Sequence, residues 1–456
     1  MDKKALEAGI NYHEFRYREA DFGGYPKGLM YGLQIFDSWL YDETKPFIHV
    51  EALGTFAFLK EQISTGYFEK LIQTYLLDNQ HGALVTIVPE PGRTARLDAE
   101  LKEKLQAYKE SLSREEIEKL VTDTKHLQEY QEEPSSQEDL EKIPMLTRED
   151  ISREIAPIYN EEMKIADIPT VFHEIETNGI GYLDLMFDLS DVPEKDLPMV
   201  GLLQAVLGII DTEHYEYGEL FNEINRHTGG IGTSLELYPD VTKVKEKEFR
   251  ATFEIKAKAL YGQIPFAIRM MKEILTASKL DDEKRLKEIL SMTKTRLQDR
   301  FLSAGHSAAA LRAMSYKSPI SKFKDTTNGI EYYQNIREME EHFDEKKEEI
   351  ISGLKALSEL LFRKGNVMIS YTASREGLAV LEEEIGSLKE ALYPERTPES
   401  RCILHCEKKN EGFKTSSKVQ FAAKAGNFID AGEEYNGALQ ILKVIMSYEY
   451  LWINIR

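Results

Sequence analysis

Cysteine is nearly absent from this chain, whose 456 residues include only Cys402 and Cys406, with His405 between them. A disulfide framework needs several cysteine pairs, so the class of small disulfide-stapled secreted proteins is excluded. A structural zinc site needs four ligands, and no second pair of thiols lies nearby in the sequence. We therefore expect no metal and no disulfide in this chain.

Long apolar runs are missing as well. No run approaches the ~20 residues that a membrane-spanning helix needs, so we expect no membrane partner. The first residues, MDKKALEAGINYHEF, have a helical pattern and lack the apolar segment of a secretion signal. Together with the few thiols, this predicts a reducing compartment, most simply the cytoplasm.

Positive charge is in deficit, because 79 Asp and Glu outnumber 58 Lys and Arg and give a formal net charge of −21 at pH 7. Proteins that bind nucleic acid present clustered Lys and Arg to the phosphates, so we exclude a nucleic-acid partner. An acidic protein attracts cations over long distances, which favours basic peptides as ligands. The alternative is a protein whose acidic helix faces only contact water.

The two zinc-peptidase motifs H-x-x-E-H and H-E-x-x-H occur nowhere in the 456 residues. The nearest likeness is HLQEY, from His126 to Tyr130, where tyrosine replaces the second histidine. A phenol must lose its proton near a pKa of ~10 before it binds zinc, so Tyr130 is a poor ligand. We interpret HLQEY as the polar face of an exposed helix.

The first part of the chain has a helical pattern. Apolar residues recur at three- and four-residue spacing to about residue 80, and the run Ala83–Val88 then predicts a strand. Two apolar stripes over residues 94–131 predict a helical hairpin. Between the stripes, Ser113 and Glu116 have the spacing of a capping box, which predicts the start of the second helix.

Residues 158–393 change to alternating strands and helices. PTVFHEIETNGIGYLDLMFDLS predicts two strands joined by an Asn178–Gly179 turn, and IGTSLELYPD, EKEFRATFEIKA and NVMISYTAS predict three more. The fold class is therefore α+β, with helices packed on one face of an antiparallel sheet. SKVQFAAKAGNFID and the helical pattern after it repeat the start of this unit, so we expect residues 415–456 to begin a further, truncated domain.

This order of segments resembles the presequence protease branch of the pitrilysin–insulinase (inverzincin) metallopeptidases over practically the whole chain. The resemblance implies LuxS/metallohydrolase-like domains joined by a helical hairpin. It assigns residues 1–92 to the end of a second domain, 94–157 to the hairpin, 158–393 to a non-catalytic third domain and 415–456 to a fourth. The segments that carry it are GINYHEFRYREADFGGYPKGLMYGLQIFDSWLYD, INRHTGGI, TKTRLQDRFLSAGHSAAALRAMSY, KAGNFIDAGEEYNGAL and YLWINIR.

The resemblance also implies zinc in the parent enzyme, held by H-x-x-E-H on a helix of the first domain. That domain is absent from this sequence. In the related third domain the equivalent positions are Leu202, Ala205 and Val206, and no His or Glu lies between Leu197 and Ile210. We therefore predict that the chain alone binds no catalytic zinc and is inactive, with no catalytic residue of its own.

Arg456 is the single residue to which the resemblance gives a substrate-binding role. In the family an arginine at this place and a following tyrosine reach the substrate, but here the chain ends at the arginine. Other candidates have structural explanations: His214 lies at a helix start, His227 at a helix end and His306 among alanines. GGIGTS lacks the lysine of a phosphate-binding loop.

We accordingly expect the non-catalytic portion of a zinc-dependent presequence-protease-like metallopeptidase. It would form the chamber wall, the hinge and a peptide-binding surface for the degradation of unstructured peptides. Its partners would be the N-terminal catalytic half and extended peptides added at the sheet edge LDLMFDLS. Two alternatives stay open: a stand-alone binding or structural subunit that pairs with a separate catalytic chain, and an unrelated helical scaffold without a sheet in 158–260.

Overall fold

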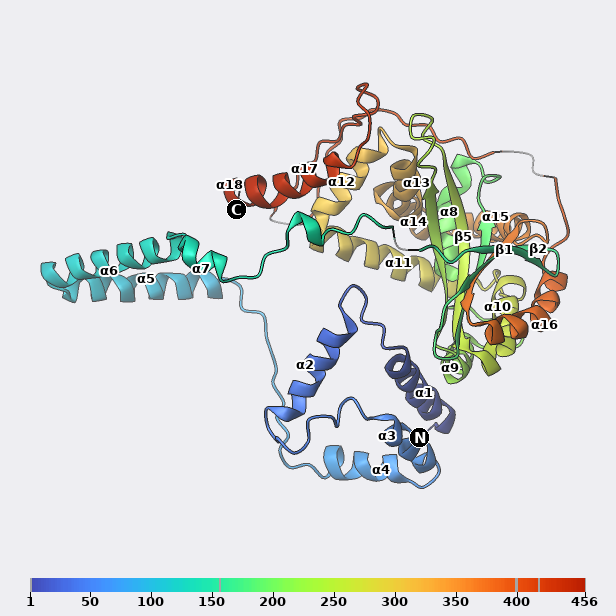
Figure 1. Cartoon of the computed structure of the whole chain (residues 1–456), viewed down its shortest axis with the longest axis horizontal. Helices are drawn as coiled ribbons and strands as arrows, with labels where there is room; N and C mark the ends of the chain where they lie inside the picture. The colour runs from blue at the N-terminus through green and yellow to red at the C-terminus, as the bar shows by residue number, and fades with distance from the viewer. Residues whose placement is uncertain (1, 156, 398–400, 417–418, 456) are drawn as a thin grey trace. The chain divides into compact units, whose positions relative to one another are not determined.

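The computed structural model describes residues 2–155, 157–397, 401–416 and 419–455 (Figure 1). The chain forms two compact units, of which one comprises Met1–Glu69 with Tyr159–Arg456 and the other Lys70–Ile158. Among the described residues, none of the helices combines the length and hydrophobicity that crossing a lipid bilayer requires.

The N-terminal residues of the first unit are helical, as the periodicity predicts. Their elements are α1 (Lys3–Glu19), α2 (Lys27–Trp39), α3 (Leu53–Gln62) and the start of α4 (Tyr67–Ile72). Asp2 caps α1 by accepting hydrogen bonds from the backbone amides of Lys4 and Ala5. The Phe15 ring of α1 lies against Gly229, where an added Cβ would come within 2.1 Å of the ring, so this contact needs glycine.

The second unit contains the predicted hairpin. Its elements are the π-helical turn η1 (Gln73–Leu77), α5 (Arg93–Ser111), α6 (Arg114–Glu132), α7 (Gln137–Glu141) and η2 (Arg148–Asp150). The Ser113 Oγ accepts from the Glu116 amide at 3.2 Å, and the Glu116 carboxylate accepts from the Ser113 amide at 2.8 Å. The capping box is therefore confirmed.

The strand prediction for Ala83–Val88 is wrong. The segment has no regular secondary structure and belongs to no sheet, and Leu84 and Ile87 are 95% and 90% exposed. A strand needs a neighbour to satisfy its backbone amides and carbonyls, and the described residues place none beside it. The predicted strand SKVQFAAKAGNFID is wrong for the same reason over its described residues 419–430.

One six-stranded sheet organises the rest of the first unit, which excludes the helical-scaffold alternative. The strand order is β1-β2-β6-β3-β5-β4; β2 and β6 run parallel and every other neighbouring pair is antiparallel. The strands are β1 (Glu161–Ile165), β2 (Ile168–Glu174), β3 (Ile180–Asp188), β4 (Ile231–Pro239), β5 (Phe249–Leu260) and β6 (Val367–Ala373).

The Asn178–Gly179 turn forms, and both residues have positive φ, 55° and 79°. The two strands that it joins are nevertheless not paired, because β6 inserts between β2 and β3. The expectation of an all-antiparallel sheet is corrected accordingly: β6 pairs parallel to β2.

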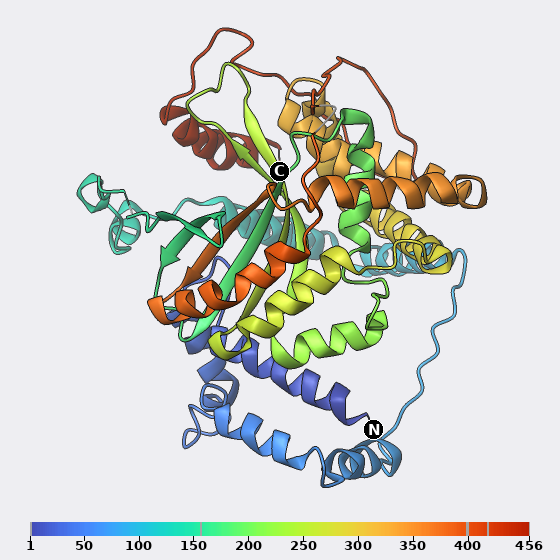
Figure 2. The ribbon, with the colours of Figure 1, turned by 90° about the vertical axis from the view of Figure 1, so that its right-hand side faces the viewer.

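Helices cover one face of the sheet. In Figure 2, α10 and α16 lie in front of the strands, and the side chains at alternate positions of β3, among them Leu183, Leu185 and Phe187, are fully buried. Phe187 and Phe253 both contact Phe362 edge-on, with ring centroids 5.0 and 5.4 Å apart. This apolar layer is the main core of the chain.

The remaining elements follow the predicted order of helices between strands. They are η3 (Glu194–Asp196), α8 (Leu197–Val206), α9 (Tyr217–His227), η4 (Tyr261–Gln263), α10 (Ile264–Thr276), α11 (Glu283–Ser303), α12 (Gly305–Ser315), α13 (Pro319–Asn328), α14 (Ile330–Glu341), α15 (Phe343–Leu361), α16 (Arg375–Ala391), α17 (Ala438–Ile445), η5 (Met446–Trp452) and α18 (Ile453–Ile455).

Candidate functional site

The predicted position of the degenerate zinc motif lies on α8. Leu202 and Val206 are fully buried, and Ala205 is partly buried against the same apolar core. Pro198 occupies the first turn of the helix, where its missing amide hydrogen costs nothing. The sequence thus builds a helix whose side chains at these three positions are all aliphatic.

Close packing surrounds α8. A Cβ added at Gly201 would lie 2.5 Å from the Thr327 carbonyl oxygen and 2.7 Å from the Tyr332 ring. Zinc needs nitrogen, oxygen or sulfur ligands with an open position for water, and Leu202, Ala205 and Val206 offer no lone pair. These residues do not fit a catalytic zinc ion.

The HLQEY likeness lies on α6, where His126 is exposed and the Tyr130 side chain is 73% exposed. Across residues 2–155, 157–397, 401–416 and 419–455, no three His, Cys, Asp or Glu side chains gather in a way that could hold a metal ion.

The three other candidate histidines lie beside acidic or aromatic side chains. His214 Nδ1 is 3.0 Å from a Glu273 carboxylate oxygen, just before α9. The His227 ring is 4.4 Å from the ring of Phe266, at the end of α9. His306 starts α12, with its ring 5.9 Å from that of Phe421.

The two cysteines are not bonded to each other. Burial, together with the charge of Glu194, raises the pKa of Cys402 to about 11. Burial also raises the pKa of Cys406. Both thiols are therefore protonated at neutral pH, which disfavours nucleophilic attack and metal binding. Arg456, the predicted substrate-binding residue, lies outside the described residues, so its role stays a prediction.

The face of the sheet opposite the apolar core carries a cluster of charges that the sequence reasoning missed. Lys256 of β5 places its Nζ 2.9 Å from Glu254 Oε2, 3.2 Å from Glu236 Oε1 and 4.0 Å from Asp184 Oδ2. Three carboxylates from three neighbouring strands thus surround a single ammonium group. The alternation of polar and apolar residues in RATFEIKAKAL could have indicated that Glu254 and Lys256 lie on the same polar face of a strand.

Glu254 is the buried centre of this cluster. It is 0% exposed, and its Oε1 accepts hydrogen bonds from the Tyr238 hydroxyl and the Thr252 hydroxyl, both at 2.7 Å. A buried carboxylate is stable only when it is paired and hydrogen-bonded. Oε1 has these two hydrogen bonds, whereas Oε2 is paired with the Lys256 ammonium but has no hydrogen-bond partner among the described residues.

Asp184 lies at the edge of the cluster. Burial raises the pKa of Asp184 to about 6; the charge of Lys256 opposes this rise, while those of Glu254 and Glu236 add to it. Burial disfavours the charged form of Lys256, but its ion pair with Glu254 and its other acidic neighbours leave the pKa of Lys256 raised overall. The cluster carries excess negative charge and suits a cationic group.

The expected peptide-binding edge LDLMFDLS is not an edge. It forms β3, which is paired on both sides with β5 and β6. The sheet ends instead at β1 and at β4, whose nine residues pair only with β5 among the described strands. Gln204 of α8 donates to the Thr233 carbonyl of β4 at 3.4 Å.

Comparison with known proteins identifies relatives. A family model for the region associated with peptidases of family M16, subfamily C, matches residues 87–339. Protein HypA of Clostridium perfringens is 37% identical over 456 residues, which are 100% of this chain and 46% of that protein. Presequence protease 1, chloroplastic/mitochondrial, of Arabidopsis thaliana is 27% identical over 466 residues, covering 100% of this chain and 42% of that protein.

Among solved structures, a peptidase M16 inactive domain from Pseudomonas fluorescens shares 14% identity. It aligns over 55% of this chain and 54% of that one, with a TM-score of 0.36. The chain spans less than half the length of the two relatives that it matches in full. Because the family model covers more than half of the sequence, the chain belongs to the family associated with the subfamily C peptidases of M16, the pitrilysin–insulinase group.

Proposed function

We propose that this chain is the non-catalytic portion of a zinc-dependent, presequence-protease-like metallopeptidase that degrades unstructured peptides. The observation that carries the proposal is the alignment with presequence protease 1 along 100% of the chain. In this role the chain supplies part of a chamber wall and a surface for the peptide, while the hairpin of α5 and α6 acts as the hinge.

Peptide binding would use the sheet. Among the described strands, the nine-residue β4 has one side without a strand neighbour, to which an extended peptide would add as a further strand by main-chain hydrogen bonds. There the peptide would displace the Gln204 side chain from the Thr233 carbonyl. The net charge of −21 and the carboxylates around Lys256 favour basic peptides.

Zinc chemistry would belong to the catalytic half. The aliphatic side chains of Leu202, Ala205 and Val206 support this division, because they cannot replace the two histidines and the glutamate of H-x-x-E-H. The chain is thus a partner of the catalytic half and not a second catalytic centre.

The first test uses the purified chain alone. It is incubated with zinc and a fluorogenic basic peptide of unstructured sequence, with full-length presequence protease 1 as the positive control. We expect no hydrolysis by the chain and no stoichiometric zinc by mass spectrometry after dialysis. Zinc-dependent hydrolysis that disappears when the chain's own residues are substituted would refute the proposal.

The second test concerns the partner. The chain is mixed with the N-terminal half of Protein HypA, and the mass of the mixture is measured by light scattering after gel filtration. We expect a one-to-one complex. If both proteins elute at their separate masses, the proposed pairing is wrong.

A further inference from the structure

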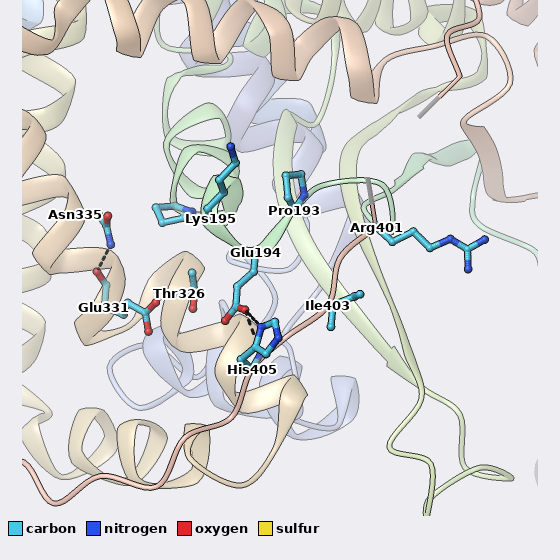
Figure 3. A pocket seen from close by; sticks show the side chains of 10 residues that line it. Pro193, Glu194, Lys195, Thr326, Glu331, Asn335, Arg401, Ile403 and His405 are labelled. Carbon is cyan, nitrogen blue, oxygen red and sulfur yellow. Dashed lines mark hydrogen bonds and ion pairs between the residues drawn. The ribbon is translucent and has the colours of Figure 1, made fainter. Parts of the chain in front are cut away.

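An open cavity of about 580 Å³ lies between the start of α8, the helices α13 and α14 and the segment that contains His405 (Figure 3). This volume is in the range of small-molecule sites. Glu194, Thr326, Glu331, Asn335 and His405 are among the residues that line it. The cavity lies in the helical part of the first unit and shares no residue with the cluster around Lys256.

The wall of the cavity carries a connected set of charges. Glu194 Oε2 is 2.7 Å from His405 Nδ1, and Glu194 Oε1 is 3.6 Å from the Lys322 ammonium. Lys322 is also 2.7 Å from Glu331 Oε2, which Arg312 contacts at 3.3 Å.

Arg312 extends the set to two further acids. It lies 2.6 Å from Asp325 and 2.7 Å from Glu411. The carboxylates of Glu194, Asp325, Glu331 and Glu411 thus face only two permanent cations, Lys322 and Arg312, among the described contacts. The set lacks positive charge, and its two members that line the cavity, Glu194 and Glu331, are both acidic, so this wall of the cavity favours a cation.

The two other basic residues of the lining do not supply that charge. Figure 3 shows the charged ends of Lys195 and Arg401 directed away from Glu194, Thr326 and Glu331. They also diverge from each other, so they form no anion site.

One buried hydroxyl in this wall has no partner. Thr326 is 1% exposed, and its Oγ1 has no hydrogen-bond partner within the described part of the chain. In Figure 3 it lies between Glu331 and Glu194. A buried hydroxyl without a hydrogen bond is costly, and a ligand N–H would satisfy it.

Neighbouring acceptors also remain open. Glu194 Oε1 has Lys322 only at 3.6 Å, beyond hydrogen-bond distance. The Asn335 amide nitrogen donates to the Glu331 carbonyl at 2.9 Å, which leaves the amide oxygen to accept. These atoms present acceptors to a ligand with several N–H donors.

We propose that this cavity binds an organic cation, a guanidinium or alkylammonium group, through Glu194, the Asn335 amide oxygen and the Thr326 hydroxyl. Glu331, whose two oxygens already accept from Lys322 at 2.9 and 2.7 Å, adds negative charge to the same wall. A metal ion is the less suitable occupant, because no described His, Cys, Asp or Glu residues converge in the groups of three or more that would hold one. The site does not depend on the proposed peptidase role. Its ligand is either the side chain of a basic residue in a peptide or a free polyamine.

The test is isothermal titration of the whole chain with three probes. Nα-acetyl-arginine amide stands for the peptide side chain, spermidine for the polyamine, and Nα-acetyl-citrulline amide has the arginine shape without the charge. We expect at least one of the two cations to bind saturably with one-to-one stoichiometry. We expect the citrulline compound to bind at least about tenfold more weakly than the arginine compound, because charge-assisted hydrogen bonds are about twice as strong as neutral ones. The tighter of the two cations identifies the source.

Variants locate the site. We expect Glu194→Gln to weaken cation binding about tenfold and Thr326→Val, which keeps the side-chain shape, to weaken it about threefold. Glu383→Gln removes one charge from an exposed position of α16 and should leave the affinity unchanged. Circular dichroism verifies that each variant is folded. If Glu194→Gln does not fold, the affinity of Thr326→Val alone tests the location of the site.

Three results would each overturn the proposal. The first is equal binding of the citrulline and arginine compounds. The second is no saturable binding of either cation up to about 10 mM, which corresponds to a binding free energy weaker than about 3 kcal/mol. The third is an equal loss of affinity in Glu383→Gln and in the cavity variants.

Discussion

Asp184→Asn tests the electrostatics of the polar sheet face. Burial raises the pKa of Asp184 to about 6, and the carboxylates of Glu254 and Glu236 contribute to the rise. Lys256 opposes it but lies 4.0 Å away. Asparagine has nearly the shape of aspartate and removes only the charge, so the substitution isolates the cost of holding a carboxylate in this place.

The sign and size of the effect follow from the pKa. The folded pKa of about 6 lies above the ordinary 3.8, so the folded chain binds this proton more tightly than the unfolded chain does. The free energy of unfolding therefore falls as the pH rises from about 4 to about 6, and the cost is complete above that window. A shift of this size corresponds to about 3 kcal/mol, which we halve to about 1.5 kcal/mol because the side chain is 32% exposed.

We expect Asp184→Asn to stabilise the sheet by about 1.5 kcal/mol at pH 8 and by almost nothing at pH 4. The assay is hydrogen exchange of the peptide that covers β3 at both pH values, supported by urea unfolding followed by circular dichroism. Asp299→Asn, at an exposed position of α11, is the matched control and should change neither measurement. Destabilisation at pH 8 would refute the reasoning, because it would mean that attraction to Lys256 outweighs burial. An equal gain at both pH values would exclude the carboxylate charge as the cause.

Three further substitutions test the packing that the structure describes. Leu202→Ala should lower the free energy of unfolding by about 2–5 kcal/mol in urea, as fully buried leucines do; a loss below about 1 kcal/mol would contradict the burial of this α8 face. Arg312→Met should cost about 3–5 kcal/mol, since it leaves the carboxylate of Asp325, which is 0% exposed, without its cation; the double variant with Asp325→Leu should recover most of that loss. Ser113→Ala should weaken the start of α6 by about 1 kcal/mol in hydrogen exchange and leave the sheet unchanged; equal protection in both proteins would contradict the capping role.

The sequence predicts the elements whose signals are local. Ser113 and Glu116 meet within one helical turn, so their spacing alone predicts the capping box that the structure contains. The period of apolar residues likewise predicts the helices and most of the strands between residues 158 and 393. These signals require no knowledge of what lies across the fold.

Pairing between distant segments could not be predicted in the same way. The Asn178–Gly179 turn indicates two paired strands, yet β6, almost 200 residues later, separates them. Ala83–Val88 has the composition of a strand but no neighbouring strand in the described chain. Its composition therefore predicted a strand that the structure does not contain. The cluster around Lys256 depends on the register of β3, β4 and β5, which brings Asp184 opposite Lys256. A single sequence does not contain that register.

The aliphatic side chains of Leu202, Ala205 and Val206 on α8 have a physical consequence for the fold. A catalytic zinc helix must keep one face polar and open to water, which removes that face from the core. In α8 the buried residues lie all around the helix, on the face of Leu202 and Val206 and on that of Gly201, which approaches Tyr332. The helix therefore contributes apolar burial on every side, and restoring two histidines would bury imidazoles without partners. Stability and metal binding compete for the same positions, and in this chain those positions serve stability.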